Sequence, residues 1–202
     1  MKLLLDIDDT LTITLPRFFM ELGWRAGICP HEVSFENINE TQRARVKVMF
    51  SSPQGRAILD TVRVTPEVYE DLEPMPGAMN FVKRIQEELP VQFTEYLTFR
   101  PKSVEGVTRA WLTRLGFPNL PMTMAGENTP YEARHKWKKN FLYKRWPEIG
   151  GIVEDDRGLP GTLNGYKGKV ILLGVETHES GCAVPCPTWE NVYDYLRTET
   201  AQ

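Results

Sequence analysis

Residues 2–12 read KLLLDIDDTLT, and this stretch decides the fold. A short apolar run ends at Leu5, and three carboxylates follow at once at Asp6, Asp8 and Asp9. An apolar run bounded by a polar cluster is typical of a buried strand that ends where the carboxylates begin. Because burying these acids without a cation or a metal would be costly, we expect them in the crevice at the carboxyl end of a central parallel strand, where open α/β sheets bind ligands.

The spacing of these acids favours a functional site. Asp6 and Asp8 are two residues apart, so both leave the strand on one face, and Asp9 points away. The alternative is an ordinary turn, because Asp and Thr are frequent turn and N-cap residues. The later motifs decide between the two interpretations.

The chain of 202 residues suits one α/β core with a modest insertion. Its formal net charge of −3 argues against a protein that mainly grips nucleic-acid backbones, since such proteins carry a basic surplus. The sequence has no apolar run near the roughly 20 residues of a membrane span and no basic leader, so we expect a cytoplasmic protein without membrane contact.

The cysteines and histidines do not form a metal-binding pattern. Cys182 and Cys186 lie in a predicted loop at the wrong spacing for a zinc site, and Cys29 stands alone, so we expect unreactive thiols. The three histidines are scattered, and we assign none a catalytic role (His31, His135 and His178).

Residues 14–72 read as helices rather than as strand–helix repeats. Pro16 stands at a first helical position, and helical segments follow at Asn39, around Ala57 and at Thr65. One helix suffices for a crossover, so this stretch predicts an inserted helical cap above the acids. The α/β core domain then comprises residues 1–13 and 73–202.

A second core strand at residues 91–97 ends in Thr98, followed by Phe99, Arg100 and Pro101. A hydroxyl at a strand end can bind a phosphoryl oxygen, although a threonine there is also a common N-cap. Arg100 either lies beside the site or pairs with a carboxylate.

A lysine is expected on the helix that starts near Tyr131 and ends near Trp146. Its apolar arc has its middle close to Lys138, whereas Lys136 lies farther from that centre. A lysine within a packed face needs an anionic partner, and the acid cluster provides one. We choose Lys138, with Lys136 as the alternative.

A later apolar strand, residues 149–153, runs into Glu154, Asp155 and Asp156. Adjacent acids at a strand end indicate a divalent cation, and Mg²⁺ prefers oxygen ligands. We expect Asp155 to bind Mg²⁺ directly, and Asp156 either to bind it through water or to orient Lys138.

Acids, threonine, lysine and acids in this order resemble the four motifs of the haloacid dehalogenase-like phosphohydrolases, over nearly the whole chain. The resemblance implies an α/β fold, a Rossmann-like three-layer core with a parallel sheet, plus a small α-helical cap of the C1 type inserted after the first strand. It implies a phosphatase in which Asp6 forms an aspartyl-phosphate and Asp8 acts as general acid and base. Asp6 and the backbone carbonyl of Asp8 would complete the metal shell, with Thr10 and Arg100 as candidate substrate contacts.

The substrate is less well defined by the sequence. The stretch from Asp71 to Ala78 and the small cap look similar to deoxyribonucleotidase-type 5'-nucleotidases, whereas the TFRP and EDDR pieces resemble polynucleotide phosphatases. We therefore expect a mononucleotide or another small phosphate monoester, with a nucleic-acid 3'-end phosphatase second. A non-catalytic phospho-ligand binding module, a mutase and a phosphonatase are further alternatives.

Several cap residues could either contact this substrate or form the core of the cap itself. They are Phe18, Phe19 and Trp24, with Arg17, Arg25, Arg43 and Arg45.

Overall fold

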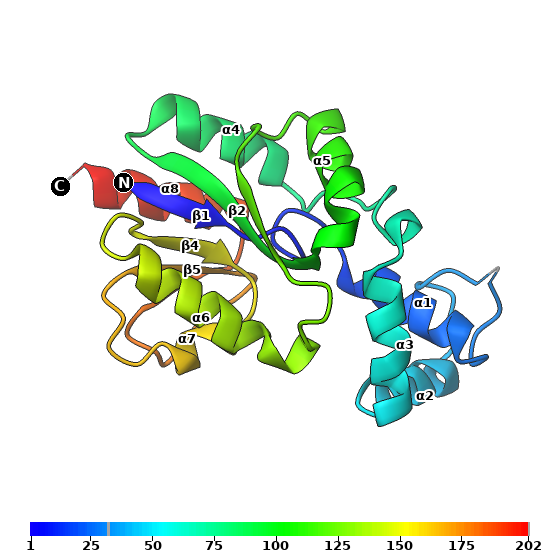
Figure 1. Cartoon of the computed structure of the whole chain (residues 1–202). Helices are drawn as coiled ribbons and strands as arrows, with labels where there is room; N and C mark the ends of the chain where they lie inside the picture. The colour runs from blue at the N-terminus through cyan, green and yellow to red at the C-terminus, as the bar shows by residue number, and fades with distance from the viewer. Residues whose placement is uncertain (32, 202) are drawn as a thin grey trace.

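The computed structural model describes residues 1–31 and 33–201, and its core is a parallel sheet of order β3-β2-β1-β4-β5-β6 (Figure 1). The strands are β1 (Lys2–Leu5), β2 (Gln92–Pro101), β3 (Met122–Ala125), β4 (Gly151–Glu154), β5 (Lys169–Leu173) and β6 (Ala183–Cys186). From β1 the strands β2 and β3 follow in order on one side. The chain then crosses to the other side of β1, where β4, β5 and β6 follow in order. The switch point lies between β1 and β4, where ligand crevices form in open α/β sheets.

Helices cover both faces of this sheet. On one face lie α4 (Ala78–Glu88), α5 (Glu105–Arg114) and α8 (Trp189–Thr200), and on the other α6 (Arg134–Arg145) and α7 (Leu159–Thr162) (Figure 1). Side chains of β1 alternate between the two layers, so Leu3 and Leu5 belong to the first core and Leu4 to the second. The α/β Rossmann-like core predicted from the sequence is therefore confirmed. Single 3₁₀ turns, η2 (Lys102–Val104) and η3 (Tyr131–Ala133), lead into α5 and α6.

The stretch between β1 and α4 forms α1 (Leu15–Arg25), α2 (Glu40–Phe50) and α3 (Pro53–Arg63), which lie beyond the carboxyl edge of the sheet (Figure 1). They pack around an apolar cluster of their own, which includes Phe19, Leu22 and Val46. The predicted fourth helix is only the 3₁₀ turn η1 (Pro66–Val68), because Val68 and Tyr69 turn into the main core.

The segment around the last two cysteines was expected to be a loop, but Ala183–Cys186 pairs with β5 as β6. This strand lies at the end of the sheet, where Pro185 is tolerated because one side of an edge strand needs no ladder hydrogen bonds. Within residues 1–31 and 33–201, no helix has both the length and the apolar character that crossing a membrane requires.

Candidate active site

Three carboxylates from the ends of β1 and β4 meet at the switch point. Asp6 follows β1, Glu154 ends β4, and Asp155 comes next, with one oxygen from each lying within 4.8 Å of the others. The backbone N–H of Asp6 donates to the carbonyl of Val153 at 3.0 Å, which ties the two strand ends together. Parallel pairing of adjacent strands thus brings together acids that are almost 150 residues apart in the sequence.

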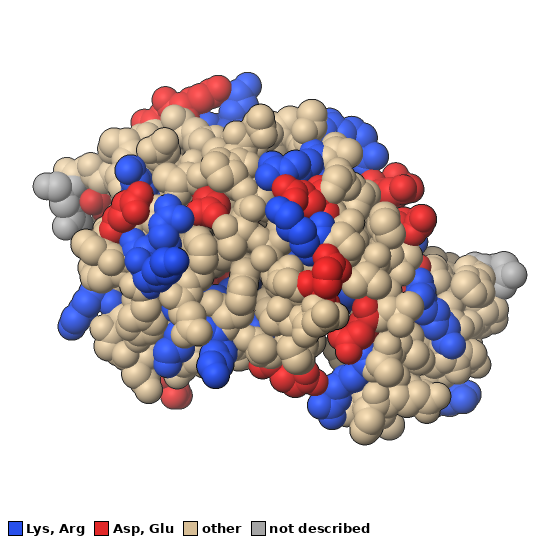
Figure 2. Space-filling view, in the orientation of Figure 1, with Lys and Arg blue, Asp and Glu red and all other residues tan. Residues whose placement is uncertain are grey.

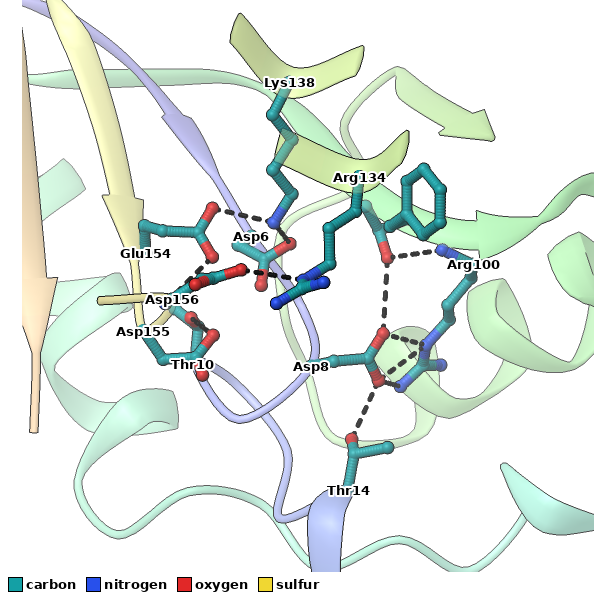
Figure 3. Close-up of polar contacts among 12 residues, drawn as sticks. Asp6, Asp8, Thr10, Thr14, Arg100, Arg134, Lys138, Glu154, Asp155 and Asp156 are labelled. Carbon is teal, nitrogen blue, oxygen red and sulfur yellow. Dashed lines mark hydrogen bonds and ion pairs between the residues drawn. The ribbon is translucent and has the colours of Figure 1, made fainter. Parts of the chain in front are cut away.

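Lys138 on α6 bridges two of these acids. Its Nζ donates to Oδ1 of Asp6 at 2.8 Å and to Oε2 of Glu154 at 2.7 Å (Figure 3). Burial disfavours the charged ammonium, but the two carboxylates outweigh it and raise the pKa of Lys138. Lys138 is buried, whereas the alternative, Lys136, is exposed to solvent.

The acid cluster carries more negative charge than Lys138 neutralises. Burial, followed by the charge of Glu154, raises the pKa values of both Asp6 and Asp155 well above that of a free carboxyl. Asp155 accepts only a long hydrogen bond among the described contacts, from the hydroxyl of Thr10 at 3.4 Å. Three buried, closely spaced carboxylates that share a single ammonium form a donor set that fits Mg²⁺.

Asp8 belongs to a second polar group beside the cluster. Nε and Nη2 of Arg100 donate to its Oδ1 at 3.0 and 2.8 Å, and the Thr14 hydroxyl donates at 2.8 Å. Arg100 therefore pairs with a carboxylate, one of the two roles considered for it. Burial opposes ionisation of Asp8, but the Arg100 guanidinium prevails and lowers the pKa of this carboxyl. The hydroxyl of Thr98 lies 3.5 Å from Oδ2 of Asp8 and accepts from the N–H of Arg100.

Asp156 faces the first turn of α6 instead of the three-acid cluster. Its Oδ2 lies 3.0 Å from Nε of Arg134 and 2.7 Å from Nε2 of His135, and its Oδ1 accepts from the N–H of Gly158. Among the described contacts Asp156 has no hydrogen bond with Lys138. The second acid partner of Lys138 is Glu154. A water-mediated role for Asp156 at a metal stays a prediction.

A cleft of about 660 Å³ opens between the inserted helices and the carboxyl edge of the sheet. Asp6, Asp8 and Asp155 lie in its wall. Phe18 lines the cleft, whereas Phe19 and Trp24 pack into the cluster of the inserted helices. None of the four arginines that were considered as substrate contacts (Arg17, Arg25, Arg43 and Arg45) is among the lining residues; Arg56 and Arg63 of α3 are.

Sequence reasoning missed two side chains that complete this arrangement. Glu154 was recognised as part of an acidic run, but its partnership with Lys138 was not foreseen, although its place as the last residue of β4 was the available signal. Arg134 precedes Lys138 by four residues, and this spacing on a helix places both on one face. His135, which was given no role, contacts Asp156.

No protein-family model and no curated protein sequence matches the chain. Solved structures do resemble it across nearly its whole length. The putative HAD-hydrolase YfnB from Bacillus subtilis, described as bound to magnesium, superposes with a TM-score of 0.57 at 15% identity, covering 97% of this chain and 98% of that one. A HAD-superfamily hydrolase of subfamily IA from Geobacter sulfurreducens gives 0.56 at 14% identity, with 96% and 95% covered.

A third structure, a haloacid dehalogenase-like family hydrolase from Xanthomonas campestris, gives a TM-score of 0.52 at 12% identity, with 100% of this chain and 96% of that chain covered. These similarities show that the chain has the fold of the haloacid dehalogenase-like hydrolases. The resemblance read from the four motifs is thereby confirmed for the fold, and the nucleotidase-like or polynucleotide-phosphatase-like branch stays a prediction.

Proposed function

We propose that the chain is a Mg²⁺-dependent phosphatase that hydrolyses a small phosphate monoester through an aspartyl-phosphate on Asp6. The observation that carries this proposal is the bridge from Lys138 to Asp6 and Glu154, with Asp155 in the same acid group and a cleft above it. A lysine held against an acid nucleophile lowers the repulsion between that acid and an incoming phosphate dianion.

In the first half of the reaction a carboxylate oxygen of Asp6 bonds to phosphorus as the bond from phosphorus to the leaving oxygen breaks. Arg100 keeps Asp8 ionised in the free protein, so Asp8 takes up a proton from solvent as the phosphate dianion enters beside it and then gives that proton to the leaving oxygen; Arg100 and Thr14 fix the direction of the Asp8 carboxyl. The hydroxyl of Thr98 donates to Oδ2 of Asp8 at 3.5 Å and would turn to donate to a phosphoryl oxygen when substrate binds. In the second half Asp8 takes a proton from the water that attacks the aspartyl-phosphate and frees phosphate.

Asp6, Asp155 and the backbone carbonyl of Asp8 would hold the metal, with Asp156 contributing through water. When bound there, Mg²⁺ supplies charge neutralisation at the phosphate. The magnesium reported for the Bacillus subtilis hydrolase is consistent with this assignment.

We also propose that residues 14–72 act as a cap and that residues 1–13 and 73–202 form the catalytic core. The separate apolar cluster of α1, α2 and α3 supports this division. Side chains of α3 reach the core across the cleft, because Arg56 pairs with Glu132 at 3.1 Å and Arg63 donates to the carbonyl of Phe99 at 3.1 Å.

For the substrate we favour a mononucleotide, because Phe18 and Tyr131 offer aromatic surface in a cleft that also contains arginines. The alternative is a nucleic-acid 3'-end phosphatase, because the TFRP sequence at residues 98–101 resembles that of polynucleotide phosphatases. Arg100 of this sequence lies at the site, where it pairs with Asp8. On the face shown in Figure 2, basic and acidic side chains are interspersed and form no basic track for a nucleic-acid backbone.

The test is a screen of about a hundred phosphorylated metabolites with and without Mg²⁺, with Asp6→Asn protein as the control for the nucleophile. We expect Mg²⁺-dependent release of phosphate by the wild-type protein and none by Asp6→Asn. Full activity of the Asp6→Asn variant would remove Asp6 as nucleophile. Turnover of nucleoside monophosphates compared with a 3'-phosphorylated oligonucleotide distinguishes the two substrate classes, and tight binding without hydrolysis would indicate a binding module.

A further inference from the structure

Within the proposed phosphatase site, Lys138 is already occupied by acids of the protein. Two of its three ammonium donors serve Asp6 and Glu154, at 2.8 and 2.7 Å. The cluster contains a third carboxylate, Asp155, for which Lys138 makes no described hydrogen bond. A divalent cation would be needed to neutralise the acids alone, so a phosphate dianion entering the site requires another positive group.

The cleft contains five further cationic side chains, and most are committed to other partners. They are Arg56, Arg63, Arg100, Arg134 and Arg157. Arg56 pairs with Glu132, and Arg63 donates to the carbonyl of Phe99 while its guanidinium lies over the Phe99 ring.

Arg100 is fully committed, whereas Arg157 is committed through one nitrogen only. Arg100 uses Nε and Nη2 on Asp8 and Nη1 on the hydroxyl of Thr108, so every nitrogen of its guanidinium has a partner. Arg157 donates Nη2 to the carbonyl of Gly174, at the end of β5.

Arg134 differs from Arg56, Arg63 and Arg100 in having two terminal nitrogens without a partner among the described residues, and from Arg157 in being anchored to an acid that follows β4. It contacts Asp156 through Nε at 3.0 Å, and its two terminal nitrogens have no hydrogen-bond partner among the described residues. In the close-up its guanidinium lies between the group of Asp6 and Asp156 and the pair of Asp8 and Arg100 (Figure 3). Asp6, Asp8 and Arg134 all line the same cleft, so a phosphoryl group between the proposed nucleophile and the proposed acid would lie in the cleft that Arg134 also lines.

The surroundings of Arg134 hold its guanidinium in place before any ligand arrives. The guanidinium carbon lies 4.5 Å from the centre of the Tyr131 ring. Asp156, its ionic partner, is fixed in turn by the N–H of Gly158 at 2.9 Å and by His135 at 2.7 Å. An arginine anchored through Nε presents its two terminal N–H groups as a fork that matches two oxygens of a phosphate.

We propose that Arg134 binds the phosphoryl group of the substrate, as a second cation on the face of α6 that carries Lys138. The assignment rests on the proposed function for the identity of the ligand. It gives the residues on α6 separate tasks: Lys138 holds the acids together, and Arg134 holds the phosphate.

The competing interpretation is that Arg134 only ties the start of α6 to the end of β4. Arg145, in the last turn of the same helix, is a matched control. It pairs with Glu95 at 2.8 Å, its side chain is 29% exposed against 28% for Arg134, and it is not among the residues that line the cleft.

The experiment measures binding of inorganic phosphate by calorimetry in the presence of Mg²⁺, for wild-type, Arg134→Gln and Arg145→Gln proteins, together with their melting temperatures. We expect Arg134→Gln to weaken phosphate binding about tenfold or more, because a charge-assisted, bidentate contact is lost. Arg145→Gln should stay within about twofold of wild type in phosphate binding, since it removes an ion pair of the same kind elsewhere on the helix. Unchanged phosphate binding by Arg134→Gln, or equal losses in both variants, overturns the proposal.

If Arg134→Gln does not fold, phosphate binding is measured with Arg134→Lys instead. It keeps the charge but removes the fork, so phosphate binding should fall at least about threefold, and an unchanged affinity counts against the proposal. Wild-type protein that hydrolyses no ester but loses phosphate binding in Arg134→Gln refutes the proposed hydrolase and supports Arg134 as a phosphate ligand. Intact hydrolysis by the wild-type protein, with phosphate binding unchanged in Arg134→Gln, supports the proposed hydrolase and refutes Arg134 as a phosphate ligand.

Discussion

Arg100 of β2 donates two hydrogen bonds to Oδ1 of Asp8, from Nε at 3.0 Å and from Nη2 at 2.8 Å. The guanidinium is almost fully buried and lies 4.4 Å from the centre of the Tyr69 ring. A side chain of the second strand therefore fixes the carboxylate that follows the first strand, and with it the direction of the proposed acid.

Replacing Arg100 by glutamine should destabilise the protein by about 3 kcal/mol near pH 7, because the Asp8 charge then lacks its partner. Arg100 lowers the folded-state pKa of Asp8 against the effect of burial. A lowered acid pKa contributes stability above the unfolded value and loses it as the pH falls through the folded value. In the wild-type protein that loss lies below about pH 4. In the variant Asp8 keeps its burial but lacks Arg100, so its pKa is raised and it becomes protonated as the pH falls from 7 towards 4, and the difference in unfolding free energy between wild type and variant, measured by urea unfolding, should narrow over this range.

Arg84→Gln is the control for this effect, because Arg84 forms an exposed pair with Glu88 at 2.9 Å. Arg84→Gln should cost much less stability than Arg100→Gln, because solvent screens an exposed pair. If Arg100→Gln lowers the free energy of unfolding by as little as Arg84→Gln does, the buried pair contributes no more to stability than a surface pair.

Lys138→Met should destabilise the protein by about 3–5 kcal/mol, because it leaves Asp6 and Glu154 buried without their shared cation. The same variant should lose phosphatase activity. Lys136→Met, two residues earlier and exposed, should change the unfolding free energy by less than about 0.5 kcal/mol. Urea unfolding of both variants checks the assignment, and a larger loss in Lys136→Met would reverse it.

Added Mg²⁺ should stabilise the wild-type protein more at pH 8 than at pH 5. In the metal-free protein burial and Glu154 raise the pKa values of Asp6 and Asp155, so these acids cost stability progressively as the pH rises through the raised values. A cation bound to the ionised acids opposes that loss, by about 2.7 kcal/mol at a hundredfold excess over its Kd.

Melting curves with and without MgCl₂ at the two pH values measure this effect. Asp155→Asn should remove most of the Mg²⁺-induced shift, and Asp71→Asn should leave it unchanged because the Asp71 side chain is 93% exposed on the surface. A shift that survives in Asp155→Asn would place the cation elsewhere.

Gly151→Ala should destabilise the sheet by more than about 3 kcal/mol. A Cβ at Gly151 would lie 2.1 Å from the carbonyl oxygen of Lys169 on β5, and backbone on a central strand cannot move away cheaply. Gly161→Ala on α7 is the control, since a Cβ there meets nothing within 4 Å and alanine favours a helix. Thermal unfolding of the two alanine variants should give opposite signs.

The parts of the fold and site that follow local rules could be predicted from the sequence. The apolar run before Asp6 and the one before Glu154 became adjacent strands, because strand ends are marked by a change from apolar to charged residues. Lys138 could be chosen because its place in the apolar arc of a helix requires an anionic partner. In both cases the sequence places a charged side chain next to apolar residues that will be buried, and the fold compensates that charge with a partner of opposite sign.

The remaining features depend on distances that no local pattern encodes. Arg100 reaches Asp8, 92 positions away, only because β2 lies beside β1. Glu154 takes a hydrogen bond from Lys138, and Asp156 one from Arg134, because side chains of α6 reach the acids at the end of β4. Four residues around Pro185 form an edge strand although their sequence is typical of a turn, because pairing with β5 outweighs the local preference.

The separate cluster of α1, α2 and α3 predicts a difference in local stability. Backbone amides of these helices should exchange with deuterium faster than those of β1, because they depend on a small apolar cluster, whereas β1 lies between two covered faces. Arg63 connects α3 to the core through the carbonyl of Phe99 and is buried, so Arg63→Gln should speed exchange in α3 and leave β4 unchanged. Arg56→Gln, which breaks an exposed pair with Glu132, should have little effect. Equal exchange rates in α3 and β1 of the wild-type protein would show that the inserted helices and the sheet open as one unit.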